Sequence, residues 1–376
     1  MPGAVYVCTT TGARYPAEPT RWCSEAGSPL DLDFTPKFTA HMFRQRPWTM
    51  WRYREAIPLE SDECIVSFQE GCTPLLPIRI DGREVFVKQD HLFPTGSYKD
   101  RGASVMISRL RELGVQSVVE DSSGNAGAAI AAYAAHSGIG CEIFVPDRTP
   151  EVKLAQIVRF GARLHRVPGP REAAASAARL AARNTCYASH VWNPYFLHGT
   201  KTCAYEICEQ LDWGAPDHIV VPVGNGSLLL GLALGFRELL GAGILDRLPR
   251  FVGVQASGCA PLYAAFQKGL DVPQEVDAHV TVAEGVAIGA PPRGAQILEV
   301  IRKTSGSIVA VSDQMIMQAV QYAARSGFSV EPTGAVGLAG LRSIICTLPA
   351  EETVVTVFTG HGLKSTATLE QISSTS

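Results

Sequence analysis

The chain has 376 residues, of which 46% are hydrophobic and 18% are charged, and its formal net charge is −3. A chain of this length buries a large core and exceeds the usual size of one domain, which predicts two packed lobes. Because acidic and basic residues are interspersed, the composition gives no indication of binding to nucleic acid or to an anionic membrane.

Membrane and export signals are not found in the sequence pattern. The apolar run 219–234 is interrupted by Pro222, Gly224 and Asn225, so no uninterrupted spanning segment is expected. Residues 1–14 do not join a basic region to an apolar stretch, and we read no signal peptide there. The ten cysteines show no dense pairing pattern, which indicates reduced thiols and a cytoplasmic protein.

Strands and helices alternate from about residue 85 onward. The predicted strands are 85–89, 116–120, 141–145, 163–167, 185–189, 218–222, 251–255 and 353–358. The predicted helices are 100–113, 125–137, 150–160, 171–183, 198–212 and 228–240. Such alternation favours an α/β fold with a mostly parallel sheet covered by helices on both faces.

The segment 94–102 places Lys99 on a glycine-containing turn between a predicted strand and a predicted helix. A lysine held there can be desolvated and become nucleophilic toward a carbonyl carbon, as in Schiff-base lysines. The same run of residues is also typical of a charged surface turn. Taken alone, the segment leaves both interpretations open.

Two further turns join a predicted strand to a predicted helix. Residues 121–127 open an alanine-rich helix, whose exposed N–H groups can hold a carboxylate while Asn125 donates to a phenolic oxygen. Residues 223–227 contain Gly224 and Gly226, which let the backbone wrap around a phosphate at a helix start. A capped helix start accounts equally well for the first turn, and a lone Gly-x-Gly is weak support for the second.

A fourth segment, 358–364, directly follows the last predicted strand. The Thr359 hydroxyl stands at a strand end, where it can meet a ring nitrogen, and the glycines beside it permit close backbone approach. An ordinary glycine turn is the alternative interpretation.

Together these four segments resemble the β-family, or fold type II, of pyridoxal 5'-phosphate (PLP) enzymes, and most closely the threonine synthases. The resemblance extends, in the family's order, over about residues 50–365. It includes the segments 51–54, 70–75, 193–195, 201–202 and 331–334.

The resemblance implies a fold type II architecture of two lobes, each with a mostly parallel twisted sheet covered by helices. Residues 60–105 and 196–376 would form the larger, PLP-binding lobe, and 106–195 the smaller one. Residues 1–59 would be an N-terminal extension with a degenerate ribbon-like start. Because Thr11 stands where a Cys-x-x-Cys arm would need a second thiol after Cys8, we expect no metal. A homodimer is also implied.

The family's roles transfer to matching positions of this chain. Lys99 would hold PLP as a Schiff base and then remove the α-proton. The remaining cofactor contacts would be the phosphate ligands Gly224, Asn225, Gly226 and Ser227, the ring-oxygen donor Asn125 and the ring-nitrogen partner Thr359. The substrate carboxylate would be held by Ser122, Ser123, Gly124 and Ala126.

The substrate is less well specified. Where threonine synthases usually carry an arginine that grips the phosphate of O-phosphohomoserine, this chain has Phe196, which cannot pair with a dianion. Arg293, His198 or Lys201 are candidates to compensate. The resemblance thus implies a lyase or synthase acting at Cβ or Cγ of a small amino acid. A serine/threonine ammonia-lyase, a β-replacement synthase and a non-catalytic scaffold relative remain as alternatives.

Overall fold

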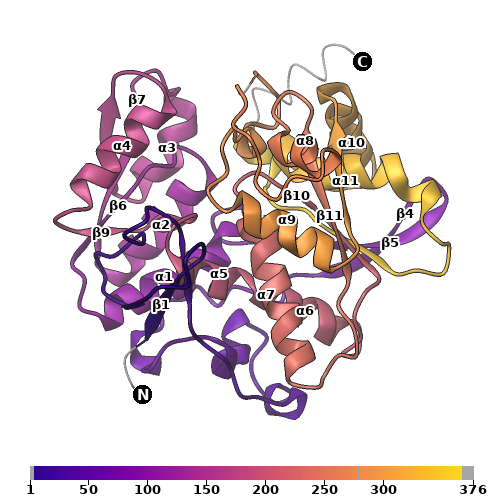
Figure 1. The fold of residues 1–376 in the computed structure, drawn as a ribbon, viewed down its shortest axis with the longest axis horizontal. Coiled ribbons are helices and arrows are strands. Elements are labelled where there is room, and N and C mark those ends of the chain that lie inside the picture. The colour runs from indigo at the N-terminus through magenta and orange to yellow at the C-terminus, as the bar shows by residue number, and fades with distance from the viewer. Residues whose placement is uncertain (1–3, 278, 366–376) are drawn as a thin grey trace. The chain divides into compact units, whose positions relative to one another are not determined.

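The computed structural model describes residues 4–277 and 279–365, which form two compact units. Within the described residues, unit 1 is drawn from 4–38, 42–71 and 99–202, and unit 2 from 39–41, 72–98, 203–277 and 279–365. The lobe boundaries expected at 105–106 and 195–196 lie near the changes of unit at 98–99 and 202–203. Each unit has its own parallel or mostly parallel sheet (Figure 1).

The sheet of unit 1 has four strands in the order β8-β7-β6-β9, and all its pairings are parallel. Its strands are β6 (Ser117–Glu120), β7 (Gly140–Pro146), β8 (Arg163–Val167) and β9 (Cys186–Tyr187). The helices between them are α2 (Asn125–Ser137), α3 (Glu151–Arg159) and α4 (Arg171–Ala181). The predicted α/β alternation is therefore confirmed in this unit.

Two further helices of unit 1 pack closely against each other, namely α1 (Lys99–Glu112) and α5 (Pro194–Thr200). A β-carbon at Gly102 would clash with the Phe196 ring, and one at Gly199 would clash with the Arg101 carbonyl group. The two glycines thus allow the helix backbones to approach. This contact fixes Phe196 beside the start of α1.

The predicted helix 198–212 is wrong as a single element. It is divided into α5 and α6 (Thr202–Gln210), with Lys201 between them as the cap residue of α5. Asn193 starts α5 early, because its Oδ1 accepts a hydrogen bond from the Tyr195 N–H at 3.0 Å. The Thr202 hydroxyl donates back to the Gly199 carbonyl at 2.7 Å, which satisfies one of the free carbonyls at the end of α5.

A three-stranded antiparallel sheet at the N-terminus was not predicted. It has the order β2-β1-β3, formed by β1 (Val5–Cys8), β2 (Arg14–Pro16) and β3 (Leu30–Leu32). Tyr6, Cys8 and Leu30 on its buried face join the same hydrophobic core as α1 and α2. This N-terminal segment is therefore part of the core of unit 1.

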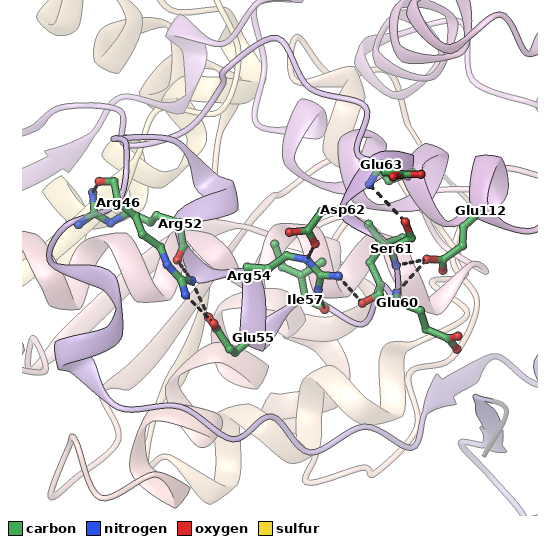
Figure 2. A network of polar contacts seen from close by, with 12 residues as sticks. Arg46, Arg52, Arg54, Glu55, Ile57, Glu60, Ser61, Asp62, Glu63 and Glu112 are labelled. Carbon is green, nitrogen blue, oxygen red and sulfur yellow. Dashed lines mark hydrogen bonds and ion pairs between the residues drawn. The ribbon is translucent and has the colours of Figure 1, made fainter. Parts of the chain in front are cut away.

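The end of α1 that lies far from Lys99 is held by a polar network (Figure 2). It involves the short 3-10 helices η2 (Met50–Ala56) and η3 (Asp62–Cys64). The Glu112 carboxylate accepts hydrogen bonds from the backbone N–H groups of Glu60 and Ser61 at 2.9 and 2.6 Å. Arg54 donates to the carbonyls of Ile57 and Leu59 at 3.1 and 2.6 Å. Segment 50–64 thus anchors the helix that Lys99 begins.

The sheet of unit 2 has six strands in the order β12-β11-β10-β13-β5-β4, and only the edge strand β4 is antiparallel to its neighbour. Its strands are β4 (Leu75–Ile80), β5 (Arg83–Lys88), β10 (His218–Pro222), β11 (Arg250–Ala256), β12 (Ser307–Val311) and β13 (Val354–Val357). All five residues of β10 are buried, as expected for a central parallel strand.

Five helices of unit 2 pack on this sheet or on one another. They are α7 (Ser227–Gly241), α8 (Pro261–Gln267), α9 (Gly294–Lys303), α10 (Asp313–Arg325) and α11 (Pro332–Ile344). Short 3-10 turns complete the unit: η4 (Asp90–Leu92), η5 (Glu284–Val286), η6 (Ile345–Thr347) and η7 (Gly362–Lys364), while η1 (Ala40–Phe43) lies at a change of unit. None of the helices in the described residues is long and apolar enough to cross a membrane.

Candidate active site

The turn between β10 and α7 in unit 2 is a tightly packed cradle. Gly226 caps α7 with a φ of 82°, a left-handed conformation that favours glycine. A β-carbon at Gly226 would clash with the Ile297 side chain, and one at Gly224 would lie only 2.9 Å from the Gly285 carbonyl oxygen. The packing of α9 and η5 on the turn therefore demands both glycines.

This turn has the chemistry of a phosphate site. It opens α7, a helix of 15 residues, so N–H groups and the positive end of the helix dipole are directed at the turn. The buried Ser227 hydroxyl lies 3.0 Å from the Tyr98 hydroxyl. The hydroxyl pair and the helix start together fit the phosphate group of a cofactor. The phosphate-binding role of residues 224–227 stays a prediction.

Unit 2 also contains two buried hydroxyls without a partner in the described chain, Thr359 Oγ1 and Ser97 Oγ. Thr359 follows β13, and the two segments are adjacent because Ser97 forms a β-bridge with Gly360 and the Tyr98 N–H donates to the Thr359 carbonyl at 3.1 Å. Leaving a buried hydroxyl unpaired costs about 1–3 kcal/mol. Thr359 Oγ1 is thus set up to meet a polar ligand atom such as a ring nitrogen.

The glycine turn after β13 is supported from α11. A β-carbon at Gly360 would clash with the Glu331 carboxylate, and the Glu331 N–H donates to the Gly360 carbonyl at 3.0 Å. His361 stacks on His91 at 5.6 Å, and its Nδ1 accepts a hydrogen bond from the Leu363 N–H at 3.1 Å. Burial, aided by the charge of His361, lowers the pKa of His91 to about 4. His361 is therefore part of the structural support of this turn.

Two lysines occupy contrasting environments. Lys88 is fully buried in unit 2, and its ammonium contacts Thr73 O at 2.7 Å, Gln210 Oε1 at 2.8 Å and Glu206 Oε2 at 2.7 Å. Its three donors are satisfied, so it is a structural cation. Lys99 is half-buried at the start of α1 in unit 1, and its Nζ lies 5.6 Å from the centre of the Phe196 ring.

The turn that precedes α2 in unit 1 is more open. Asn125 is the first residue of α2, and Gly124 is exposed with a φ of −111°. A β-carbon at Gly124 would meet only the Ser122 hydroxyl, at 4.0 Å, whereas one at Gly127 would clash with the Ser122 carbonyl. Space is therefore left beside Gly124, where the sequence predicts that Ser122, Ser123, Gly124 and Ala126 hold a carboxylate.

Phe196 is fully buried in unit 1, and its ring lies edge-to-face with His190 at 6.0 Å. His198 and Lys201, the candidates on or next to α5 to replace the missing arginine, lie away from the Phe196 ring. Lys201 Nζ lies 2.8 Å from His198 Nδ1 and 5.0 Å from the centre of the Phe34 ring. Because positions 196 and 198 are about 200° apart around a helix, His198 does not share the face of Phe196.

Arg293 belongs to unit 2, where it is buried at the start of α9. Its guanidinium donates to Gln296 Oε1 at 2.8 Å. Arg293 therefore stabilises the beginning of the helix whose Ile297 packs against Gly226.

Three acid–base residues of unit 1 were not selected from the sequence. Glu120 ends β6 and is fully buried, Asp121 follows it, and His190 Nδ1 lies 3.0 Å from Glu120 Oε1. The available signal was an apolar strand that ends in two consecutive acids, at the carboxyl edge where α/β sheets bind ligands. No group of three or more potential metal ligands occurs in the described part of the chain.

The chain resembles known proteins over most of its length. Residues 66–360 match the family model described as pyridoxal-phosphate dependent enzyme. The chain is 36% identical over 372 residues to the threonine synthase of Methanocaldococcus jannaschii, a match that covers 95% of this chain and 92% of the relative. It is 35% identical over 376 residues to the threonine synthase of Methanosarcina acetivorans, covering 96% of this chain and 92% of the relative.

Two solved structures with the same fold are of proteins whose names refer to serine. The L-serine ammonia-lyase of Rhizomucor miehei matches with a TM-score of 0.69 and 26% identity, over 81% of this chain and 98% of that one. The serine racemase of Dictyostelium discoideum matches with a TM-score of 0.65 and 25% identity, over 77% of this chain and 92% of that one.

Proposed function

Because the chain belongs to the family of pyridoxal-phosphate dependent enzymes, we propose that it is a lyase or synthase acting at Cβ or Cγ of a small amino acid. The PLP cofactor, when bound, supplies an electron sink for the α-carbon. The observation that carries the proposal is the buried Thr359 hydroxyl, which has no partner in the described chain and lies in the same unit as the phosphate cradle.

The residues of the chain divide into three groups by proposed role. Lys99 attaches the cofactor covalently through its amine and then takes the α-proton of the substrate. The other proposed cofactor-binding residues are Gly224, Asn225, Gly226 and Ser227 for the phosphate, Thr359 for the ring nitrogen and Asn125 for the ring oxygen. The proposed substrate-binding residues are Ser122, Ser123, Gly124, Ala126, Phe196 and Arg293.

The type of reaction follows from Thr359. A neutral hydroxyl stabilises positive charge on a ring nitrogen less than a carboxylate would, so the negative charge that develops at Cα is spread less far. Loss of a leaving group is then favoured over transamination. The threonine synthases among the relatives agree with elimination or replacement as the reaction class.

The strict form of the proposal is conversion of O-phosphohomoserine to threonine, as the names of the relatives suggest. Phe196 argues against this form, because a buried aromatic ring close to Lys99 offers no donor to a phosphate group. The second candidate is a serine/threonine ammonia-lyase or a β-replacement synthase, which the same ring and the ammonia-lyase structure favour.

Borohydride treatment of the purified protein tests the covalent role of Lys99. We expect a cofactor absorption band that borohydride alters, and we expect Lys99→Ala to lose that band and all turnover. The matched control is Lys303→Ala, which removes an exposed lysine paired with Glu299 at 2.5 Å. An unchanged band in Lys99→Ala would refute the assignment.

We also propose that the protein is a cytoplasmic homodimer. The proposed location is supported by its ten cysteines, all of which are free thiols. Light scattering should give twice the mass of one chain, and a monomer at micromolar concentration would contradict the dimer. Fractionation of the source cells, with the protein detected outside the cytoplasm, would contradict the location.

A further inference from the structure

An acid–base cluster in unit 1 has no role in the proposal so far. Glu120 and Asp121 are consecutive acids at the carboxyl end of β6, and Glu120 is fully buried. Glu120 Oε1 lies 3.0 Å from His190 Nδ1, and the Tyr187 hydroxyl donates to Asp121 Oδ1 at 2.7 Å. The Asp121 N–H also donates to Glu120 Oε2. The four residues form one connected hydrogen-bonded group, in which the Asp121 backbone links the two acids.

This cluster is continuous with Phe196 and Lys99. The rings of His190 and Phe196 lie 6.0 Å apart in an edge-to-face arrangement, and Lys99 Nζ lies 5.6 Å from the centre of the Phe196 ring. The charge of Lys99 acts on both Glu120 and His190. The cluster therefore begins at the proposed reaction centre and ends at Asp121, the residue before the open turn at 122–124.

The surroundings of the cluster favour the protonated forms of its two acids. Burial raises the pKa of Glu120, and burial together with the Glu120 charge raises the pKa of Asp121 to about 7. Burial, with the nearby charge of Lys99, keeps the pKa of His190 well below its usual range, so the imidazole is neutral. The exposed Arg171 is a further cation whose charge acts on Glu120 and His190.

We propose that Phe196, His190, Glu120 and Asp121 form the subsite for the substrate side chain, and that this subsite accepts amino acids with a free hydroxyl on Cβ and rejects phosphate esters. This inference rests on the proposed function and specifies its substrate class. A phosphate dianion would lie beside buried carboxylates and an aromatic ring, where its charge is repelled and unpaired. A hydroxyl is neutral and accepts a hydrogen bond from a protonated acid.

A proton held by the two acids would match the chemistry of a hydroxyl leaving group. With L-serine, the Cα–H bond breaks and its proton goes to Lys99. The Cβ–O bond then breaks, and the oxygen leaves as water with a proton from the Glu120–Asp121 pair. Lys99 afterwards returns its proton to that pair, and the released enamine takes up water to give pyruvate and ammonia. A phosphate group leaves without needing that proton, so it gains nothing from the acids.

The substrate test compares free and phosphorylated amino acids on the PLP-loaded enzyme. L-serine and L-threonine are assayed against O-phospho-L-serine and O-phospho-L-homoserine, with 2-oxo acid, ammonia and phosphate measured separately. We expect kcat/KM to be at least about 100-fold higher for the free hydroxyl amino acids. A second readout is the shift of the cofactor band on titration, which should need far less L-serine than O-phospho-L-serine.

The variant test uses Glu120→Gln and Asp121→Asn. Each should lower kcat for L-serine about 10- to 100-fold, as expected for loss of a proton donor, while the cofactor band is retained. The matched control is Glu142→Gln in β7 of the same sheet, where Glu142 pairs with His165 at the half-exposed surface. We expect this control to match the wild type within about two-fold, since surface pairs contribute little.

The outcomes distinguish failure of the subsite proposal from failure of the proposed function. A cofactor band with preferred turnover of the phosphorylated amino acids would overturn the subsite and leave the proposed function standing. The subsite is overturned in the same way if Glu120→Gln and Asp121→Asn behave like Glu142→Gln. If Glu120→Gln does not fold, the half-buried Asp121→Asn carries the test alone. A protein that binds no PLP would overturn both levels.

Discussion

The two turns that join a parallel strand to a helix, 121–127 in unit 1 and 223–227 in unit 2, share a Gly-Asn pair but have different surroundings. In unit 2, both glycines of the turn are enclosed by protein atoms, and Gly226 has a positive φ. In unit 1, Gly124 has a negative φ, and a β-carbon there would meet nothing closer than 4.0 Å. The fold therefore explains the glycines of unit 2 but not Gly124.

The space around each glycine distinguishes those that the packing requires from those beside a proposed ligand site. A glycine that the fold requires should affect stability when it is replaced, whereas a glycine beside open space should affect only what binds there. On this criterion the turn of unit 2 is a rigid, preformed cradle. The turn of unit 1 has an open side at Gly124, where we propose that the substrate carboxylate binds.

Gly226→Ala should have the largest effect. The substitution adds a left-handed alanine, which costs about 1–2 kcal/mol, and a clash with Ile297, so we expect a loss of about 2–5 kcal/mol in the free energy of unfolding together with loss of cofactor binding. Gly243→Ala is the control, because Gly243 has a φ of 68° but nothing within 4 Å of a β-carbon. Urea unfolding measures both losses. Equal losses of the free energy of unfolding for the two variants would contradict the conclusion that protein atoms enclose Gly226.

Asp121→Asn should have the next largest effect, and it depends on pH. Because folding raises the pKa of Asp121 from 3.8 to about 7, the folded protein binds the proton more tightly, and stability falls as pH rises through this window. Asparagine does not titrate, so the variant should gain about 2–4 kcal/mol relative to wild type between about pH 4 and about pH 8. Urea unfolding at both pH values measures this, and a pH-independent difference would contradict it.

Gly124→Ala should leave the fold intact and weaken substrate binding. We expect the free energy of unfolding to stay within about 0.5 kcal/mol and KM to rise about ten-fold, because the methyl group enters the space proposed for the substrate carboxylate. Steady-state kinetics and thermal unfolding check the two parts. A strongly destabilised variant with an unchanged KM would reverse the comparison between the turns.

Tyr98→Phe should have the smallest effect. It removes the hydroxyl that lies 3.0 Å from Ser227 in the unit 2 turn, and we expect PLP affinity to fall by about 1 kcal/mol. Tyr322→Phe is the control, since its hydroxyl donates to the Arg79 carbonyl at 2.6 Å elsewhere in the same unit. Fluorescence titration with PLP should distinguish the two variants, and equal affinities would exclude a role for Tyr98 in the turn.

Regular elements with clear punctuation could be predicted from the sequence. The expected bounds 125–137, 163–167 and 218–222 coincide with α2, β8 and β10. The division at Lys201 could not be predicted, because its surroundings depend on Phe34, which is distant in the sequence. The sheet β2-β1-β3 was missed for a similar reason, since its pairing of Cys8 with Leu30 depends on contacts between short strands far apart in the chain.

The candidate site shows the same division between local and distant information. Glycine turns and a lysine between a strand and a helix are local patterns, so residues 99, 125, 224–227 and 359 could be proposed directly. The contact of Glu120 with His190, 70 positions later, forms only when β9 pairs with β6. The unpaired state of Thr359 Oγ1 likewise depends on the burial that the completed sheet of unit 2 imposes.

The fit between Gly102 and Phe196 limits how this enzyme can change during evolution. The aromatic ring fills the volume that any side chain at position 102 would need, so the two positions cannot vary independently. In a selection for a new substrate, residues larger than glycine at 102 should appear only in clones that have first replaced the phenylalanine with a smaller residue. Deep mutational scanning of both positions would reveal that order as strong epistasis.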